Sequence, residues 1–544
     1  MTEKMTTLRD NATVRWIALL LLALAMFCSY IFTDILSPIK DLMQDTRGWD
    51  SESFGRMQGA EVFLNVYVFF LIFAGIILDK MGVRFTAVLS GAVMLVGGIL
   101  KFYACTEGFD DTSLGMWFGS HFNWHLTIPI LKDIPPFAEG MPGSAKFAAV
   151  GFMIFGCGVE MAGITVSRGI VKWFKGRETA LAMGSEMALA RLGVATCMIF
   201  SPFFAKLGGG VHVENSVKFG VVLLCIALMM FIVYFFMDKK LDAQTGEAEE
   251  KDDPFKISDL GKIFSSLGFW LVALLCVLYY SAIFPFQKYA VNMLQCNLEL
   301  TEADSTTFWG QDAVTIVQYI IMLVVAICAF TSNFSKKKGL KIGLMAFAAV
   351  ALVVFCFMGY MRGTAETIFA VFPLLAVAIT PILGSYVDHK GKAATMLMLG
   401  SVLLVVCHLT FAFLLPGISA QSPAGGVVVA YLTILVLGAS FSLVPAALWP
   451  SVPKLVDEKI IGSAYAAIFW IQNIGLGLFP ALIGSVLTNT NPKDTAAHDL
   501  DYTWALVMLA ALGIAALLIS IYLKAVDKKK GYGLEMPNIK QEEK

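Results

Sequence analysis

The distribution of apolar residues constrains this chain more than any other feature. Runs of about 20 apolar residues, the length that crosses a bilayer as an α-helix, recur from residue 14 to residue 524. They fall near 14–37, 59–79, 84–104, 147–171, 179–205, 217–237, 267–287, 313–332, 341–361, 367–386, 393–415, 425–448, 460–487 and 503–524. Because 58% of the 544 residues are hydrophobic and 15% are charged, a single water-soluble core is excluded. The sequence predicts an all-α membrane protein with about fourteen transmembrane helices.

Lysine and arginine are concentrated in every second linker between these runs, which predicts the orientation of the helices. The basic linkers contain Lys4, Arg9 and Arg15; Lys80 and Arg84; Lys172 to Arg177; Lys239 and Lys240; Lys336 to Lys338; Lys390 and Lys392; Lys454 and Lys459; and Lys528 to Lys530. By the positive-inside rule these linkers and both termini are cytoplasmic. The net charge of -1 carries no information in such a chain, and no basic patch indicates a nucleic-acid partner.

A charged glycine motif occurs twice in short cytoplasmic loops. GIILDKMGVR runs from Gly75 to Arg84 and GSYVDHKGK from Gly384 to Lys392. In both copies an aspartate follows the first glycine by four residues and precedes the next glycine by three. The motif residues are Gly75, Asp79, Lys80, Gly82 and Arg84, and Gly384, Asp388, Gly391 and Lys392. The glycines permit a tight turn against a neighbouring helix, and each aspartate can face a helix N-terminus or a cation on the other half.

An acidic, mixed-charge segment at 238–266 separates the two copies and is expected to be a flexible cytoplasmic linker. It divides the chain into an N-terminal half at 1–237, with an external insertion at 105–146, and a C-terminal half at 267–544. With its duplicated motif, the chain resembles the major facilitator superfamily, which has two six-helix halves and a G-x-x-x-D-[RK]-x-G-[RK] loop after the second helix of each. Two helices are then left over. We place this inserted pair near 313–361. Two extra spans at this position leave the membrane orientation of all later helices unchanged.

A narrower resemblance involves motifs in both halves. GVE at 158–160, WFKGRE at 173–178, ARLG at 190–193, CVLYY at 276–280, ALWP at 447–450 and QNIG at 472–475 are similar to the branch of the superfamily typified by the lysosomal dipeptide transporter. The chain departs from that branch in its extra helix pair, its long external segment and Glu186, and it has no evident dileucine sorting signal. These departures favour a prokaryotic-type relative in the cell membrane.

Two opposite charges fall within apolar helices at similar depth. Glu160 and Arg191 each lie about 18 to 20 Å into the membrane at 1.5 Å per residue. A charge there costs about 3 kcal/mol or more, so such residues usually face a cavity and a partner. The same arithmetic places four further polar residues at this depth, from the C-terminal half: Tyr279, Tyr280, Gln472 and Asn473. The resemblance implies that these six residues bind a dipeptide, with Arg191 on its carboxylate and Glu160 on its ammonium.

The expected function is therefore that of a secondary active or facilitative transporter that moves dipeptides by alternating access, with Asp79 and Asp388 in the gating loops. One alternative is a proton-coupled symporter of organic anions or amino acids, in which Arg191 alone binds a carboxylate and Glu186 is the coupling candidate. Another is a non-transporting sensor or scaffold, with the inserted helices docking an accessory subunit. In a purely structural alternative, Glu160 and Arg191 form a permanent ion pair that joins their two helices and bind no substrate. No cofactor motif, metal-ligand set or nucleophile arrangement indicates an enzyme.

Overall fold

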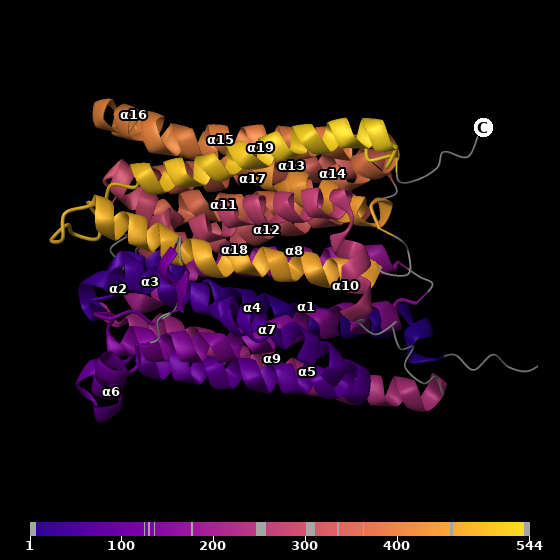
Figure 1. The fold of residues 1–544 in the computed structure, drawn as a ribbon, viewed down its shortest axis with the longest axis horizontal. Helices are drawn as coiled ribbons and strands as arrows, with labels where there is room; N and C mark the ends of the chain where they lie inside the picture. The colour runs from indigo at the N-terminus through magenta and orange to yellow at the C-terminus, as the bar shows by residue number, and fades with distance from the viewer. Residues whose placement is uncertain are drawn as a thin grey trace, which may run out of the picture.

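The computed structural model describes residues 7–537 apart from 124–125, 129–130, 135–136, 176–177, 246–256, 301–310, 335–336, 363 and 457–460. Its long helices run side by side in one bundle (Figure 1). Helix α1 begins, and α19 ends, at the end of the bundle near α10, which we call the terminal end. The opposite end, near α6, is the distal end.

The N-terminal half begins with a short 3₁₀ turn, and its first two spans are divided into shorter helices. Its elements are η1 (Leu8–Asp10), α1 (Ala12–Thr33), η2 (Ser37–Ile39), α2 (Lys40–Arg47), α3 (Ser51–Gly59), η3 (Ala60–Val62), α4 (Phe63–Tyr67), α5 (Phe70–Ala104), α7 (Gly143–Trp173), α8 (Thr179–Ala205) and α9 (Val213–Thr245). The C-terminal half follows a short helix, α10 (Ile257–Phe264). Its elements are α11 (Leu267–Leu298), α12 (Gln311–Phe334), α13 (Lys338–Arg362), α14 (Ala365–Lys390), α15 (Ala393–Leu409), the π-helical turn η5 (Thr410–Leu414), α16 (Leu415–Gln421), α17 (Pro423–Ser451), η6 (Val452–Lys454), α18 (Ile461–Thr490) and α19 (Thr503–Lys530).

Within the described residues, 13 helices are long and apolar enough to span a membrane. One of them, α5, contains the end of one expected span and the whole of the next, because Gly82 turns the chain between them with a φ of 79°. This accounts for the difference from the fourteen runs of the sequence. The all-helical membrane fold is thus confirmed, with one small exception at the distal end.

That exception lies in the segment 105–146, which carries a compact cap. It contains η4 (Phe109–Asp111), α6 (Ser113–His121) and a hairpin of two short antiparallel strands, β1 (Leu126–Ile128) and β2 (Leu131–Ile134). The cap is fixed to the start of α7, because the backbone N–H and the hydroxyl of Ser144 both donate to the carboxylate of Asp110 at 2.6 Å.

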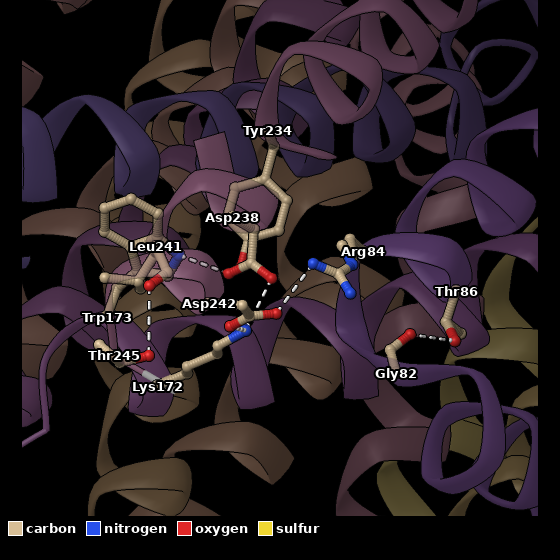
Figure 2. A network of polar contacts seen from close by, with 10 residues as sticks. All are labelled: Gly82, Arg84, Thr86, Lys172, Trp173, Tyr234, Asp238, Leu241, Asp242 and Thr245. Atoms are coloured by element: carbon tan, nitrogen blue, oxygen red, sulfur yellow. Dashed lines mark hydrogen bonds and ion pairs between the residues drawn. The ribbon is translucent and has the colours of Figure 1, made fainter. Parts of the chain in front are cut away.

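The linker expected from residue 238 begins instead as ordered helix, since α9 continues to Thr245. Asp238 and Asp242 on this last stretch accept ion pairs from Lys172 at 2.7 and 2.6 Å, and Asp242 also pairs with Arg84 at 2.9 Å (Figure 2). These contacts hold α9 against the end of α7 and the loop at Gly82. The acidic composition of 238–266 predicted a solvated linker, but Asp238 and Asp242 at its start form ion pairs with Lys172 and Arg84. Residues 246–256 of the linker lie outside the described part of the chain.

The halves meet more closely at the distal end than at the terminal end. Residues 364–374, at the distal start of α14, are all buried, whereas Ile382 and Tyr386 near its terminal end are 39% and 42% exposed. The second span of the N-terminal half follows the same pattern, with Met57 fully buried and Phe73 53% exposed. Both helices lie between the halves, since α14 packs on α8 and α3 packs on α18. The halves are therefore packed together at the distal end, whereas these side chains lie exposed toward the terminal end.

The helices at the position of the expected inserted pair are α12 and α13. They pack on each other, and both also contact α14. Helix α12 reaches α8 of the opposite half as well, where the rings of Tyr319 and Phe200 meet edge to face at 4.8 Å.

Candidate functional site

Glu160 and Arg191 both lie near the middle of their helices. Glu160 is 17 residues from the distal start of α7 and 13 from its end, and Arg191 is 12 residues from the start of α8 and 14 from its end. Both side chains are partly exposed although their helices are packed within the bundle. The structure therefore places these two charges near the middle of two long apolar helices.

Arg191 is surrounded by aromatic rings. Its guanidinium carbon lies 5.0 Å from the ring centres of both Phe284 and Phe441, and 5.9 Å from that of Tyr30. Tyr30 belongs to α1 of the same half, whereas Phe284 on α11 and Phe441 on α17 belong to the other half. Arg191 therefore lies at the seam between the halves.

The hydrogen-bonding groups of Arg191 remain available. Among the described residues, Arg191 forms no ion pair or hydrogen bond, and none of its nitrogens is a buried atom without a partner. Those nitrogens therefore reach surface that water can touch. A permanent ion pair between Glu160 and Arg191, the structural alternative, is absent from the described part of the chain.

Glu160 also contacts the opposite half. Its Oε1 accepts a hydrogen bond from Nδ2 of Asn473 on α18 at 3.2 Å. Close backbone packing positions this part of α7, because a Cβ on Gly156 would collide with the carbonyl oxygen of Glu61. Glycine at 156 thus lets η3 approach α7 one turn before Glu160. The N-terminal half thus supplies the carboxylate of Glu160 to the seam, and the C-terminal half supplies the amide of Asn473.

Glu186 lies on α8 between Arg191 and the terminal end. It is partly exposed, and within the described residues it forms an ion pair with neither Arg191 nor Arg168. Arg168 instead pairs with Asp79 at 2.6 Å. Across the described ranges, Glu186 is therefore an accessible carboxylate outside any ion pair.

Of the remaining predicted site residues, Tyr280 lies near Arg191, whereas Gln472 and Tyr279 form their hydrogen bonds within the C-terminal half. Tyr280 lies beside the rings at Arg191, with its ring centre 5.4 Å from that of Phe284, and its hydroxyl accepts a hydrogen bond from Trp449 at 3.2 Å. Gln472 accepts a hydrogen bond from Cys276 at 3.3 Å. Tyr279 is 1% exposed and bonds Ser440 at 2.5 Å inside the C-terminal half. The structure does not bring Tyr279 to the seam, because neighbouring residues of a helix point about 100° apart.

The first glycine motif forms a turn that is tied to its own half. The positive φ of Gly82 permits the turn, and Asp79 pairs with Arg168 on α7. Arg84 pairs with Asp242 on α9 (Figure 2). Lys80 is exposed. No atom of another element lies within 4 Å of a Cβ built on Gly75, so this glycine has no close neighbour in the present conformation of the described chain.

The second motif copy is covered by the C-terminal tail. Gly391 and Lys392 have φ values of 75° and 65°. The backbone N–H groups of Lys392 and Ala393 donate to the carbonyls of Glu535 and Leu534 at 3.1 Å. Gly384, like its counterpart, has no described neighbour within 4 Å, and Asp388 lies half-buried near the end of α14. Each motif loop is thus fastened to its own half.

A second polar cluster, which no sequence pattern indicates, joins the halves closer to the distal end. Lys288 on α11 pairs with Asp34 at 2.8 Å and lies 3.9 Å from Glu61. Gln287 donates to the other oxygen of Asp34 at 2.7 Å. All three of Asp34, Gln287 and Lys288 are less than a tenth exposed. We call these four residues the distal cluster.

No metal-binding arrangement accompanies either cluster. Among the residues that the structure describes, no group of three or more His, Cys, Asp or Glu side chains has a geometry that could hold a metal ion.

Comparison with known proteins identifies the family. The model of the Major Facilitator Superfamily matches residues 22–365. The chain is 25% identical over 402 residues to the lysosomal dipeptide transporter MFSD1 of Bos taurus, an alignment that covers 72% of this chain and 68% of the relative. It is 23% identical over 482 residues to the protein of the same name in Danio rerio, covering 87% and 80%.

Solved structures of transporters share the fold. The nucleoside transporter NupG aligns over 93% of this chain and 99% of its own with a TM-score of 0.57 at 12% identity. A structure described as showing substrate recognition in proton dependent oligopeptide transporters aligns over 94% and 99% with a TM-score of 0.54 at 12% identity. With the helical bundle and the duplicated loop, these matches show that the chain belongs to the Major Facilitator Superfamily and is a membrane transporter, not an enzyme.

Proposed function

We propose that this transporter moves dipeptides, or small zwitterions like them, by alternating access at the seam between its halves. The observation that carries the proposal is the pair Glu160 and Arg191. They are opposite charges at mid-depth, accessible, each in contact with the other half, and not neutralised by one another. Since an unpaired charge inside a membrane is costly, a zwitterionic ligand is the natural partner for both. The relatives named as dipeptide transporters support this substrate class.

Each residue has a distinct role in the proposal. The planar guanidinium of Arg191 binds a carboxylate through two parallel N–H donors. Glu160 accepts the ammonium of the ligand, while Asn473 keeps one of its oxygens oriented from the opposite half. Tyr280 lies beside the rings at Arg191 on the C-terminal side of the seam, where the peptide bond or a side chain of the ligand would pass. Gln472, which precedes Asn473 and bonds Cys276 of its own half, would reach the ligand from the same side. Substrate bound in this way contacts both halves at once, as central sites of such transporters require.

The positive-inside rule supports assigning the terminal end to the cytoplasm of the cell membrane. The present conformation is then closed outside and open inside. In the opposite conformation the terminal ends must approach, and Gly75 and Gly384 leave room for that approach in the two motif loops. Asp79 and Asp388 would serve as latch residues there.

The second candidate is a proton-coupled symporter of organic anions or amino acids. The observation that favours it is Glu186, which is accessible and forms no ion pair among the described residues. A carboxylate of this kind can take up and release a proton during the cycle. In this mechanism Arg191 alone anchors the substrate.

Purified protein in proteoliposomes tests the proposal. Thermal-shift screening against dipeptides, amino acids and simple carboxylates identifies ligands, because a ligand that binds only the folded state raises the melting temperature. Counterflow of a labelled dipeptide then measures transport. We expect Arg191→Ala and Glu160→Gln each to abolish dipeptide counterflow while the protein stays monodisperse. Wild-type counterflow in either variant removes that residue from the site, and preference for ligands without an ammonium favours the symporter.

A further inference from the structure

The rings at Arg191 form a cage around the guanidinium group. Phe284 and Phe441 meet each other edge to face, with ring centres 5.6 Å apart and planes at 84°. The guanidinium carbon is equally close, 5.0 Å, to both ring centres, and Tyr30 adds a third ring at 5.9 Å. A planar cation that contacts two perpendicular rings and a third has few orientations left.

Ring faces stabilise a cation without using its hydrogen-bond donors. The electron-rich face of an aromatic ring attracts the positive charge, whereas a carboxylate in the same place would occupy the N–H groups. Arg191 has three rings and, in the described part of the chain, no carboxylate hydrogen-bonded to it. Its five donors therefore stay free while its charge is partly compensated.

We infer that Phe284 and Phe441 are positioning residues for the substrate carboxylate, because they hold Arg191 with its donors directed to the ligand. This inference rests on the proposed function. The two rings come from the C-terminal half and Arg191 from the N-terminal half. A movement of the halves thus changes the cage, so the affinity of Arg191 for a carboxylate depends on the conformation of the transporter.

The cage is supported by further rings of the C-terminal half. Phe441 lies 5.5 Å from Phe372 on α14, and Tyr280 lies 5.4 Å from Phe284. Phe372 and Phe441 are 2% and 3% exposed, so this support is packed and not free to rotate. A side chain held in place before binding loses less entropy when the ligand arrives. The support also provides a matched control, since Phe372 touches the cage without contacting Arg191 in any described ring contact.

The experiment measures how strongly binding depends on the ligand carboxylate. Alanyl-leucine and its C-terminal amide are titrated against wild-type protein and against Phe284→Leu, Phe441→Leu, Phe284→Tyr and Phe372→Leu. We expect the wild type to prefer the free acid over the amide. In Phe284→Leu and Phe441→Leu this preference should fall by about tenfold, the factor expected for loss of a desolvated cation–π contact. Phe284→Tyr retains a ring and should keep the preference, as should Phe372→Leu.

The outcomes separate this inference from the function on which it rests. If wild-type protein binds neither ligand, the proposed dipeptide function fails. If the wild type prefers the acid and both leucine variants keep that preference, the function stands and the positioning role is wrong. A general loss of packing would weaken both ligands equally and leave the preference unchanged, and this result also overturns the role.

Discussion

At the scale of single residues, the geometry of Arg191 predicts that its charge alone does not suffice for binding. Arg191→Lys keeps a positive charge but offers a single ammonium in place of a planar pair of donors. We expect the affinity for alanyl-leucine, measured by isothermal titration, to fall at least about tenfold, the loss of one charge-assisted hydrogen bond. Arg191→Ala provides the lower bound. Equal affinity of the lysine variant and the wild type would show that the carboxylate is bound elsewhere.

Among the candidate site residues, those that the sequence makes predictable are charges within an apolar segment. Glu160 and Arg191 could be found in this way, because a charge at mid-depth needs a partner or a ligand to offset its cost. The cage residues Phe284 and Phe441 could not, since aromatic side chains are common in membrane helices and carry no signal of what they face. Tyr279 was assigned with Tyr280, although neighbours on a helix point in different directions.

At the scale of elements, the tail contact makes Gly391 sensitive to substitution. Alanine there must adopt a φ of 75°, which costs about 1–2 kcal/mol, and its Cβ would also collide with the carbonyl oxygen of Glu535. Gly391→Ala should therefore lower the melting temperature in detergent. Gly417→Ala is the matched control, because Gly417 lies in a helix with open space around it. A melting temperature as high as that of the control would mean that the tail does not rest on this turn.

The apolar runs predicted the helices because each helix is dictated by its own length and composition. The contacts that hold the loops were not predictable, since they join residues far apart in the chain. Asp242 fastens the first motif loop through Arg84, and Asp238 fastens α9 to Lys172 of α7. The second loop is fastened by the tail instead, where both oxygens of the Glu535 carboxylate accept hydrogen bonds from Thr395, at 2.9 and 2.8 Å.

At the scale of the whole molecule, the closed end depends on charges that are buried only when the halves touch. Burying an ion pair consumes much of its attraction in desolvation, so such a contact holds the halves together weakly and can be reversed. Removing one partner has a larger effect, because the remaining charge is buried alone. Asp34 and Lys288 are 2% and 7% exposed in the closed arrangement. The alternation of basic linkers does not predict which end closes, since that depends on contacts between the halves.

Lys288→Met should therefore shift the transporter away from the distally closed conformation. Spin labels at Thr46 and Thr490, which are exposed on opposite halves at the distal end, would report the change as a longer distance in pulsed electron resonance. Native Cys225, which is exposed, is replaced first. Adding Asp34→Asn to this variant removes one of the carboxylates left without a partner. It should therefore restore part of the population with a short distance between the two labels. An unchanged distribution in Lys288→Met would mean that apolar contacts alone hold this end closed.

Helix α12 lies across the seam, in contact with α14 of one half and α8 of the other. Because α12 contacts both halves, it restricts their movement relative to one another. When the halves move, α12 must slide along either α14 or α8. If it slides along α8, the edge-to-face contact between Tyr319 and Phe200 must break. We therefore expect the contacts of α12 with both halves to limit how far, and how fast, the two halves move relative to one another.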